Sequence, residues 1–278
     1  MSVLLFTIVV LLGAFLAGLL GSMTGLGGGV IIIPLLTLVL GVDIHYAIGA
    51  SIISVIATSS GSAAAYVKEG ITNIRIGMFL EIATTISAIF GAVITIYINP
   101  SYIAIVFGMI LLFSAAMMIR KKVDRSDNDT SGKLALMLKL NGTYPTDEGI
   151  KKYAVHNVVG GFMMMFIAGI ISGLLGIGSG ALKVIAMDNI MRIPFKVSTT
   201  TSNFMMGVTA AASAVVYFHR GQIDPGIAMP VTIGVLVGST LGAKILLRTK
   251  TDKLKVVFAV VVTFLALQMI YNGATGRL

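Results

Sequence analysis

Apolar runs alternate with short polar breaks along all 278 residues of the chain. A helix needs about 20 apolar residues to cross a membrane, and the runs that meet this need simply are 47–67, 76–97, 102–119, 197–218, 226–247 and 256–273. Two further runs, 3–40 and 153–191, are too long for one crossing, and a glycine cluster interrupts each. Residues 1–20 lack a basic start and a small-residue cleavage site, so we interpret them as a retained helix and not a signal peptide. The pattern predicts an all-α polytopic membrane protein.

Composition supports this class. The chain is 56% hydrophobic and 11% charged, whereas soluble domains carry about 25% charged residues, so a soluble enzyme and a nucleic-acid binder are excluded. With no Cys and three scattered His, disulfides, thiolate sites and His metal sites have no basis, and we expect no cofactor. The membrane segments hold no nucleophile–base pair or carboxylate pair, so we also expect no enzyme.

The chain repeats itself at a constant offset. The matched pairs include Gly25/Gly176, Gly27/Gly178, Gly29/Gly180, Ser51/Ser202, Tyr66/Tyr217 and Phe107/Phe258. Single Gly matches are common in membrane helices, but a register without gaps over roughly a hundred residues indicates duplication. We therefore predict a membrane repeat at 1–122, a polar linker at 123–152 and a second membrane repeat at 153–278.

The basic residues favour an inverted relation between the repeats. With about five membrane segments each, two inverted repeats place the linker and nearly all loop Lys and Arg on the cytoplasmic side, leaving Arg220 and Arg277 outside. Parallel repeats would move Arg192, Lys196 and the basic cluster at 248–255 outward. Inverted repeats with broken helices near the midplane are typical of secondary transporters. The segments 28–41 and 180–191 are short enough to be either full spans or re-entrant pieces. Within the linker, Asn141-Gly142 is a turn signal, compatible with a small hairpin or with an irregular loop.

The glycine clusters are the strongest candidates for function. Each is followed by an apolar stretch that can restart a helix, and unpaired N–H groups at such a restart favour an anion. The alternative is that the glycines only permit close helix packing. Recurrence of the cluster in the same register in both repeats favours an anion-binding site. In such a site, the N-termini of the two restarted helices would point at one anion near the midplane.

At these residues the sequence resembles the sulfite exporter TauE/SafE family, also called the toluene sulfonate uptake permeases. The resemblance rests on Gly18-Leu-Leu-Gly-Ser-Met-Thr-Gly-Leu-Gly-Gly-Gly29, its repeat at 169–180, and the segments 47–51 and 198–202. It covers nearly the whole chain except the linker. It implies transport of sulfur-containing oxyanions and organosulfonates across the cytoplasmic membrane. Ile185 stands where the first repeat has Pro34, and Ser179 replaces Gly28, so the halves contribute unequally.

We expect the binding site to combine backbone groups, neutral donors and one cation. Its candidate residues are Thr24, Gly25, Gly27, Gly28, Gly29, Ser51, Gly176, Gly178, Ser179, Gly180, Lys183, Thr200, Thr201, Ser202 and Asn203. Lys183 either binds the anion or extends to water or to Asp188. The hydroxyl run 198–202 either binds the anion or joins helices to each other. Glu81 is either a proton-coupling carboxylate or reaches water or Arg75.

The sequence thus predicts a secondary transporter that moves sulfite or a short organosulfonate by alternating access. An anion channel with the same glycine-loop site and a membrane accessory subunit are the alternatives. The expected partners are the small anion and the lipid bilayer, with no nucleic acid, and small-residue faces would permit a homodimer.

Overall fold

The computed structural model describes residues 2–119, 131–146, 149–248 and 252–276. Its long helices are α1 (Val3–Thr24), α3 (Ile44–Lys68), α4 (Ile74–Ile94), α5 (Pro100–Ile119), α7 (Val158–Leu175), α9 (Phe195–His219), α10 (Pro225–Arg248) and α11 (Asp252–Thr275). A 3-10 turn, η2 (Thr95–Tyr97), extends α4. Among the described residues, α1, α3, α4 with η2, α5, α7 and α10 contain stretches long and apolar enough to cross a membrane. The prediction of an all-α polytopic membrane protein is confirmed for the body of the fold.

Each glycine-broken run folds into a long helix followed by a short one. Left-handed backbone at Gly25 (φ 76°) and Gly27 (φ 81°) ends α1, a conformation that glycine adopts without steric cost. The chain then forms α2 (Gly29–Pro34) and a π-helical turn, η1 (Leu35–Val39). The second repeat has the same path, with Gly176 (φ 67°) and Gly178 (φ 73°) before α8 (Gly180–Ile185) and η3 (Ala186–Ile190). The π turn forms with or without the proline.

The short segments are too short to cross a membrane. Six helical residues and five π-helical residues rise about 16 Å at 1.5 Å per residue, half of a bilayer core of about 30 Å. The alternative of full spans for 28–41 and 180–191 is therefore wrong, and each repeat has four long helices and one half-length segment. The repeat boundaries 1–122, 123–152 and 153–278 stay predictions. Residues 120–122 of the first repeat, residues 123–130 and 147–148 of the linker, and Arg277 lie outside the described residues.

Long helices pair mainly across the two halves of the chain. α1 packs along α10, α4 along α7, and α5 along α11, while α3 lies between α9 and α10. Small residues allow this close approach: a Cβ on Gly173 of α7 would lie 1.9 Å from the carbonyl oxygen of Ala88 in α4. A Cβ on Gly238 of α10 would lie 2.0 Å from the carbonyl oxygen of Phe15 in α1.

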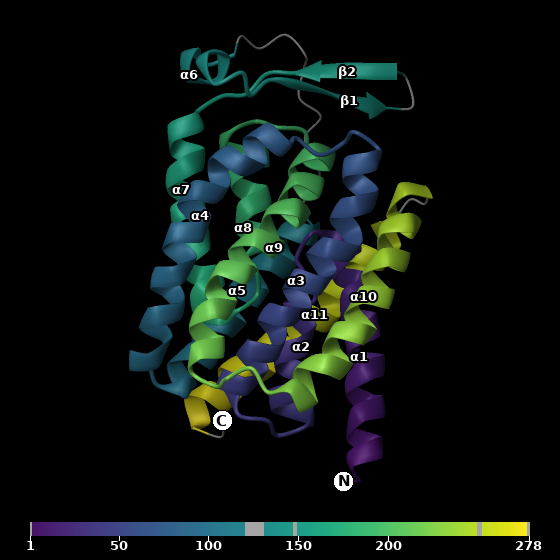
Figure 1. The fold of residues 1–278 in the computed structure, drawn as a ribbon, viewed down its shortest axis with the longest axis vertical. Coiled ribbons are helices and arrows are strands. Elements are labelled where there is room, and N and C mark those ends of the chain that lie inside the picture. The colour runs from purple at the N-terminus through teal and green to yellow at the C-terminus, as the bar shows by residue number, and fades with distance from the viewer. Residues whose placement is uncertain (1, 120–130, 147–148, 249–251, 277–278) are drawn as a thin grey trace.

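The linker forms a small cap on one end of the helix bundle. It contains a short helix, α6 (Lys133–Met137), and an antiparallel hairpin of β1 (Gly142–Thr146) and β2 (Gly149–Tyr153). The cap lies at the end of the bundle opposite the free ends of α1 and α11 (Figure 1). A hairpin is present, but a turn at Asn141-Gly142 is wrong, because Gly142 begins β1. The Asn141 side chain instead accepts from the Val155 N–H (3.0 Å) and donates to Ser131 Oγ (2.8 Å).

Candidate functional site

The two glycine loops, 25–29 and 176–180, meet inside the bundle. A Cβ on Gly180 would lie 2.1 Å from the carbonyl oxygen of Gly25, and one on Gly29 would lie 3.1 Å from the carbonyl oxygen of Gly176. The backbones are thus in direct contact, although the loops belong to different repeats. The predicted meeting of the two clusters is confirmed as a contact.

We call this contact between loops 25–29 and 176–180 the crossing. Hydroxyl groups from α3 and α9 hold it in place. Ser51 Oγ donates to the carbonyl oxygen of Gly176 (2.7 Å), and Ser202 Oγ donates to that of Gly180 (3.2 Å). Both serines are fully buried and occupy matching repeat positions. In addition, the Gly28 N–H donates to Thr58 Oγ1 (3.3 Å). The second loop is therefore fixed by side chains of both α3 and α9, and the first loop by Thr58 of α3.

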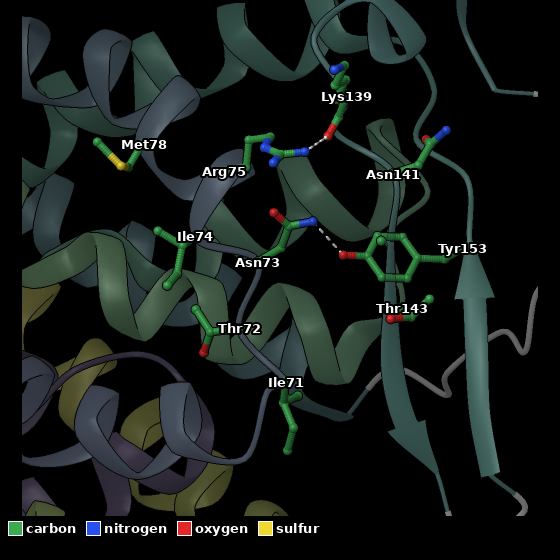
Figure 2. Close-up of a pocket in the computed structure, with 11 residues that line it drawn as sticks. Ile71, Thr72, Asn73, Ile74, Arg75, Met78, Lys139, Asn141, Thr143 and Tyr153 are labelled. Atoms are coloured by element: carbon green, nitrogen blue, oxygen red, sulfur yellow. Dashed lines mark hydrogen bonds between the residues drawn. The ribbon is translucent and has the colours of Figure 1, made fainter.

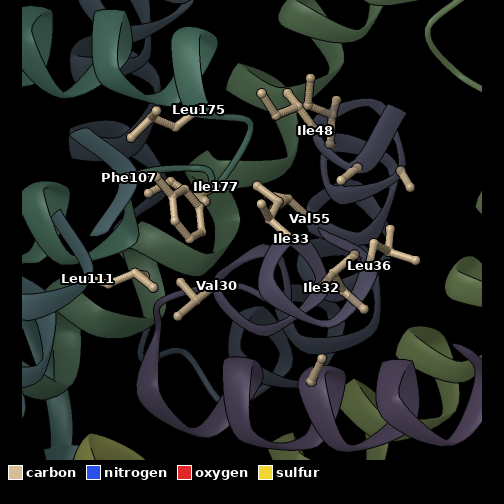
Figure 3. Close-up of a cluster of buried hydrophobic side chains, with 14 of the residues drawn as sticks. Val30, Ile32, Ile33, Leu36, Ile48, Val55, Phe107, Leu111, Leu175 and Ile177 are labelled. Carbon is tan, nitrogen blue, oxygen red and sulfur yellow. The ribbon is translucent and has the colours of Figure 1, made fainter. Parts of the chain in front are cut away.

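An apolar shell closes part of the crossing. Figure 3 shows Val30, Ile32 and Ile33 of α2 among side chains from α3, α5 and the second loop, and all of these residues are buried. Ile177 of the second loop lies in the same cluster. Polar groups near the crossing are therefore shielded from lipid by packed side chains.

Buried polar atoms without partners lie on the α9 side of the crossing, which we call its polar side. Asn203 Nδ2 donates to the carbonyl oxygen of Ser22 at the end of α1 (3.3 Å), and Thr199 lies against Gly25. Asn203 Oδ1 and Thr199 Oγ1 are buried and have no hydrogen-bond partner. The matching positions in the first repeat, Ile48 and Ile52, pack on Gly176. Buried oxygens without partners are costly, so these two atoms are candidates for contact with a water or a ligand.

Lys183 forms an ion pair that the sequence did not predict. The side chain is 0% exposed, and its Nζ donates to Thr209 Oγ1 (2.5 Å) and lies 3.8 Å from Glu81 Oε2. Thr209 also donates to Glu81 Oε1. The expectation that Glu81 reaches water or Arg75 is wrong, because Glu81 is 7% exposed and Arg75 donates to the carbonyl oxygen of Lys139 (2.9 Å).

Other predicted residues lie near the crossing but bond elsewhere. Thr24 donates to the carbonyl oxygen of Leu20 (2.9 Å), Ser179 to that of Ala168 (2.6 Å) and Thr200 to that of Lys196 (3.0 Å). Thr201 Oγ1 accepts from the Asn73 N–H (3.1 Å) at the start of α4. These hydroxyls satisfy backbone groups. No group of three or more His, Asp or Glu that could hold a metal occurs in the described part of the chain.

Comparison with known proteins decides the family. Residues 10–269 match the sulfite exporter TauE/SafE family. The chain belongs to this family. It is 28% identical over 276 residues to the probable membrane transporter protein YunE of Bacillus subtilis, covering 96% of this chain and 98% of that protein. It is 25% identical to the probable membrane transporter protein YdhB of the same organism, covering 84% and 88%. No solved structure matches the chain.

A probable membrane transporter protein of Xylella fastidiosa is also similar, with 26% identity over 93% of this chain and 91% of its own length. The resemblance to the TauE/SafE family is thus confirmed, and the chain is a multi-pass membrane protein of a transporter family. Sequence reasoning missed Thr209 and the partner of Lys183. One signal was available: Thr209 matches Thr58 in the repeat register.

This TauE/SafE protein also has an open pocket of about 510 Å³ between the cap and the bundle. Figure 2 shows Arg75 and Asn73 of the bundle facing Lys139 and Tyr153 of the cap. Asn73 Nδ2 donates to Tyr153 Oη (2.7 Å), and burial raises the pKa of Tyr153 above its usual value. The Tyr153 hydroxyl therefore keeps its proton while it accepts from Asn73, and it ties the cap to α4.

Replacing Tyr153 with Phe is expected to lower the free energy of unfolding by about 1 kcal/mol, because one partly buried hydrogen bond is lost. Thermal unfolding in detergent measures this change. Tyr97→Phe is the matched control, since Tyr97 is 83% exposed. Equal unfolding temperatures for the two variants would show that the cap is not held by this contact.

Proposed function

We propose that the chain is a secondary transporter that moves a small sulfur-containing anion, sulfite or a short organosulfonate, across the cytoplasmic membrane. The observation that carries the proposal is the contact of the two glycine loops beside a fully buried lysine. A buried cation in a membrane segment is costly and marks a functional site. The family supports a sulfur oxyanion as the substrate class.

The proposed binding site lies on the polar side of the crossing. Its residues are those predicted from the sequence (Thr24, the glycines of the two loops with Ser179, Ser51, Lys183 and Thr200–Asn203), to which we add Thr199. Weak binding by neutral donors and one cation suits an anion that must be released after transport. The Thr199 hydroxyl has no partner and is able to donate to an oxyanion. Asn203 Nδ2 donates one hydrogen to Ser22 and has a second one to donate, whereas Asn203 Oδ1 only accepts.

The proposed mechanism is alternating access between two inverted repeats. Two features support it. The helix pairs α1–α10 and α7–α4 occupy matching repeat positions, and α7 begins at the cap whereas α1 begins at the opposite end (Figure 1). With the cap on the cytoplasmic side, the positive-inside rule is satisfied. A homodimer is compatible with this arrangement but is not required by it.

The proposal is tested by flux in proteoliposomes. The panel is radiolabelled sulfite, ethanesulfonate, sulfoacetate, sulfate, taurine and chloride. We expect saturable uptake of one sulfur anion, together with counterflow, which a channel does not show. Uptake that never saturates would favour the anion channel, and no uptake of any anion would favour an accessory subunit.

Asn203→Ile tests the polar side of the crossing. The change gives α9 the residue that α3 has at the matching position, so we expect the fold to persist while half-saturation for the anion rises about tenfold or more. Thr263→Val is the control, because the Thr263 hydroxyl bonds to the backbone of its own helix, α11, outside the proposed site. Half-saturation constants from initial uptake rates measure the effect, and an unchanged constant in Asn203→Ile would remove this residue from the site.

A further inference from the structure

The Glu81 carboxylate is buried in the membrane region and faces one cation. Glu81 Oε1 accepts from Thr209 and from Thr85 Oγ1 (3.2 Å). Glu81 Oε2 has no hydrogen-bond partner and lies 3.8 Å from Lys183 Nζ. Thr209 bridges the pair, since it accepts from Lys183 while it donates to Glu81. The pair is therefore a coupled unit in which one carboxylate oxygen, Glu81 Oε2, has no hydrogen bond.

Few other ionisable groups lie on the surrounding elements. Of the elements packed around the pair, α7 has no ionisable side chain, and α5 has Tyr102, which is 66% exposed. α9 has Lys196 in its first turn and Tyr217 and His219 in its last, whereas Thr209 lies in its middle. η3 has Asp188, beyond Lys183, and Arg75 of α4 bonds to the cap. The charge of Lys183 is thus balanced mainly by Glu81.

The pair exists in one repeat only. The positions that match Glu81, Lys183 and Thr209 are Thr232, Ile32 and Thr58. Thr58 accepts from the Gly28 N–H, so its role is to hold the first loop. The two repeats therefore differ at equivalent positions, because the second-repeat lysine and the first-repeat glutamate form an ion pair that has no counterpart. One such unit per chain implies a single coupled event per transport cycle.

We propose that Glu81 is the proton site of this transporter and that its protonation releases Lys183 to the anion. The inference rests on the proposed function, since it requires Lys183 to bind the anion. While Glu81 is ionised, Lys183 is neutralised, and the carboxylate repels an incoming anion. When a proton binds Glu81, the buried lysine loses its counter-charge, and the anion replaces it. Anion and Glu81 thus compete for one ammonium group.

The charge balance fixes the stoichiometry. The empty site holds Lys⁺ and Glu⁻, and the loaded site holds Lys⁺, protonated Glu81 and a monoanion, so both are neutral. Loading the site therefore adds one proton and one anion in total. The transporter therefore carries a monoanion and a proton in the same direction, one to one, without moving net charge. Membrane voltage has no effect on this cycle, whereas a pH gradient drives it.

The experiment uses full-length protein in proteoliposomes with the voltage clamped at zero. The probe is radiolabelled ethanesulfonate, which stays a monoanion at all relevant pH values, with sulfite as a second probe. With the lumen one pH unit more alkaline than the outside, we expect up to about tenfold accumulation by the wild type, since a tenfold proton gradient balances a tenfold anion gradient. Imposing a voltage at equal pH is expected to give no accumulation.

Glu81→Gln separates coupling from binding. Gln is neutral, as protonated Glu81 is, so we expect anion exchange between labelled and unlabelled pools to persist while accumulation driven by pH is lost. Glu69→Gln, at an exposed carboxylate after α3, is expected to keep both activities. Should Glu81→Gln not fold, proton entry measured with a trapped pH dye in the wild type tests the stoichiometry, with one proton expected per anion, and uptake without proton entry would overturn the proposal.

The outcomes are distinguishable. No saturable uptake of either probe by the wild type would overturn the proposed function itself. Saturable uptake that a pH gradient does not drive, or accumulation retained in Glu81→Gln, would overturn only the role of Glu81. Accumulation driven by voltage at equal pH would also contradict a neutral one-to-one cycle.

Discussion

Replacing Gly180 with Val is expected to abolish folding or transport, with more than about 4 kcal/mol lost from the free energy of unfolding. A Cβ at this position would lie 2.1 Å from the carbonyl oxygen of Gly25 and 2.8 Å from the sulfur of Met206. The first of these is backbone, so it cannot rotate away. The two loops would have to separate, and the bonds from Ser51 and Ser202 to loop carbonyls would break with them.

The measurement is the yield and thermal unfolding of purified protein, followed by flux. Gly132→Ala is the control, since a Cβ there meets nothing closer than 3.7 Å and the backbone φ is −62°. Wild-type stability and flux in Gly180→Val would mean that the loops do not touch, and the proposed site would lose its geometry.

Lys183→Met is expected to stop anion transport and to cost about 3–5 kcal/mol of stability. Removing one member of a buried ion pair leaves the other charge without compensation. Met matches the length of the lysine stem as far as Cε, with sulfur in place of Cδ, and removes the ammonium group. The double variant Lys183→Met, Glu81→Gln is neutral at both positions, so we expect it to regain most of the stability while remaining inactive.

This combination separates a structural from a functional role. Thermal unfolding gives the stability of each variant, and initial uptake rates give the activity. Recovery of transport in the neutral double variant would show that the ion pair serves folding alone, and Lys183 would then be removed from the binding site. Recovery of stability alone would support its role toward the anion.

The glycine loops could be predicted from the sequence because their geometry has a local cause. Gly25, Gly27, Gly176 and Gly178 adopt positive φ, which residues with a Cβ rarely do. Two such clusters in constant register therefore indicated two equal breaks. The length of the short helices was not predictable: the apolar run of the first repeat continues through its π turn, η1, and the two polar residues of η3 do not mark where α8 ends.

The ion pair could not be predicted, because its members come from different repeats. Glu81 lies on α4 and Lys183 on α8, and the repeat register identifies equivalent positions, not contacting ones. Periodicity indicates a buried face without naming the helix that covers it. Sequence proximity instead suggested Arg75 and Asp188. The prediction of a turn at Asn141-Gly142 was wrong for a similar reason. The Asn141 side chain bonds to Val155 and Ser131, which lie outside its local segment.

The pairing of α1 with α10 and of α4 with α7 has a consequence for biosynthesis. When the first half of the chain has entered the bilayer, its helices lack the neighbours that belong to them, and the loop at Gly25–Gly29 has no second loop to pack against. The first half can therefore reach its final packing only after α7 and α10 have been synthesised. A chain truncated after α9 would lack α10 and α11, so α1 and α5 would be without the helices that they pack against in the complete protein.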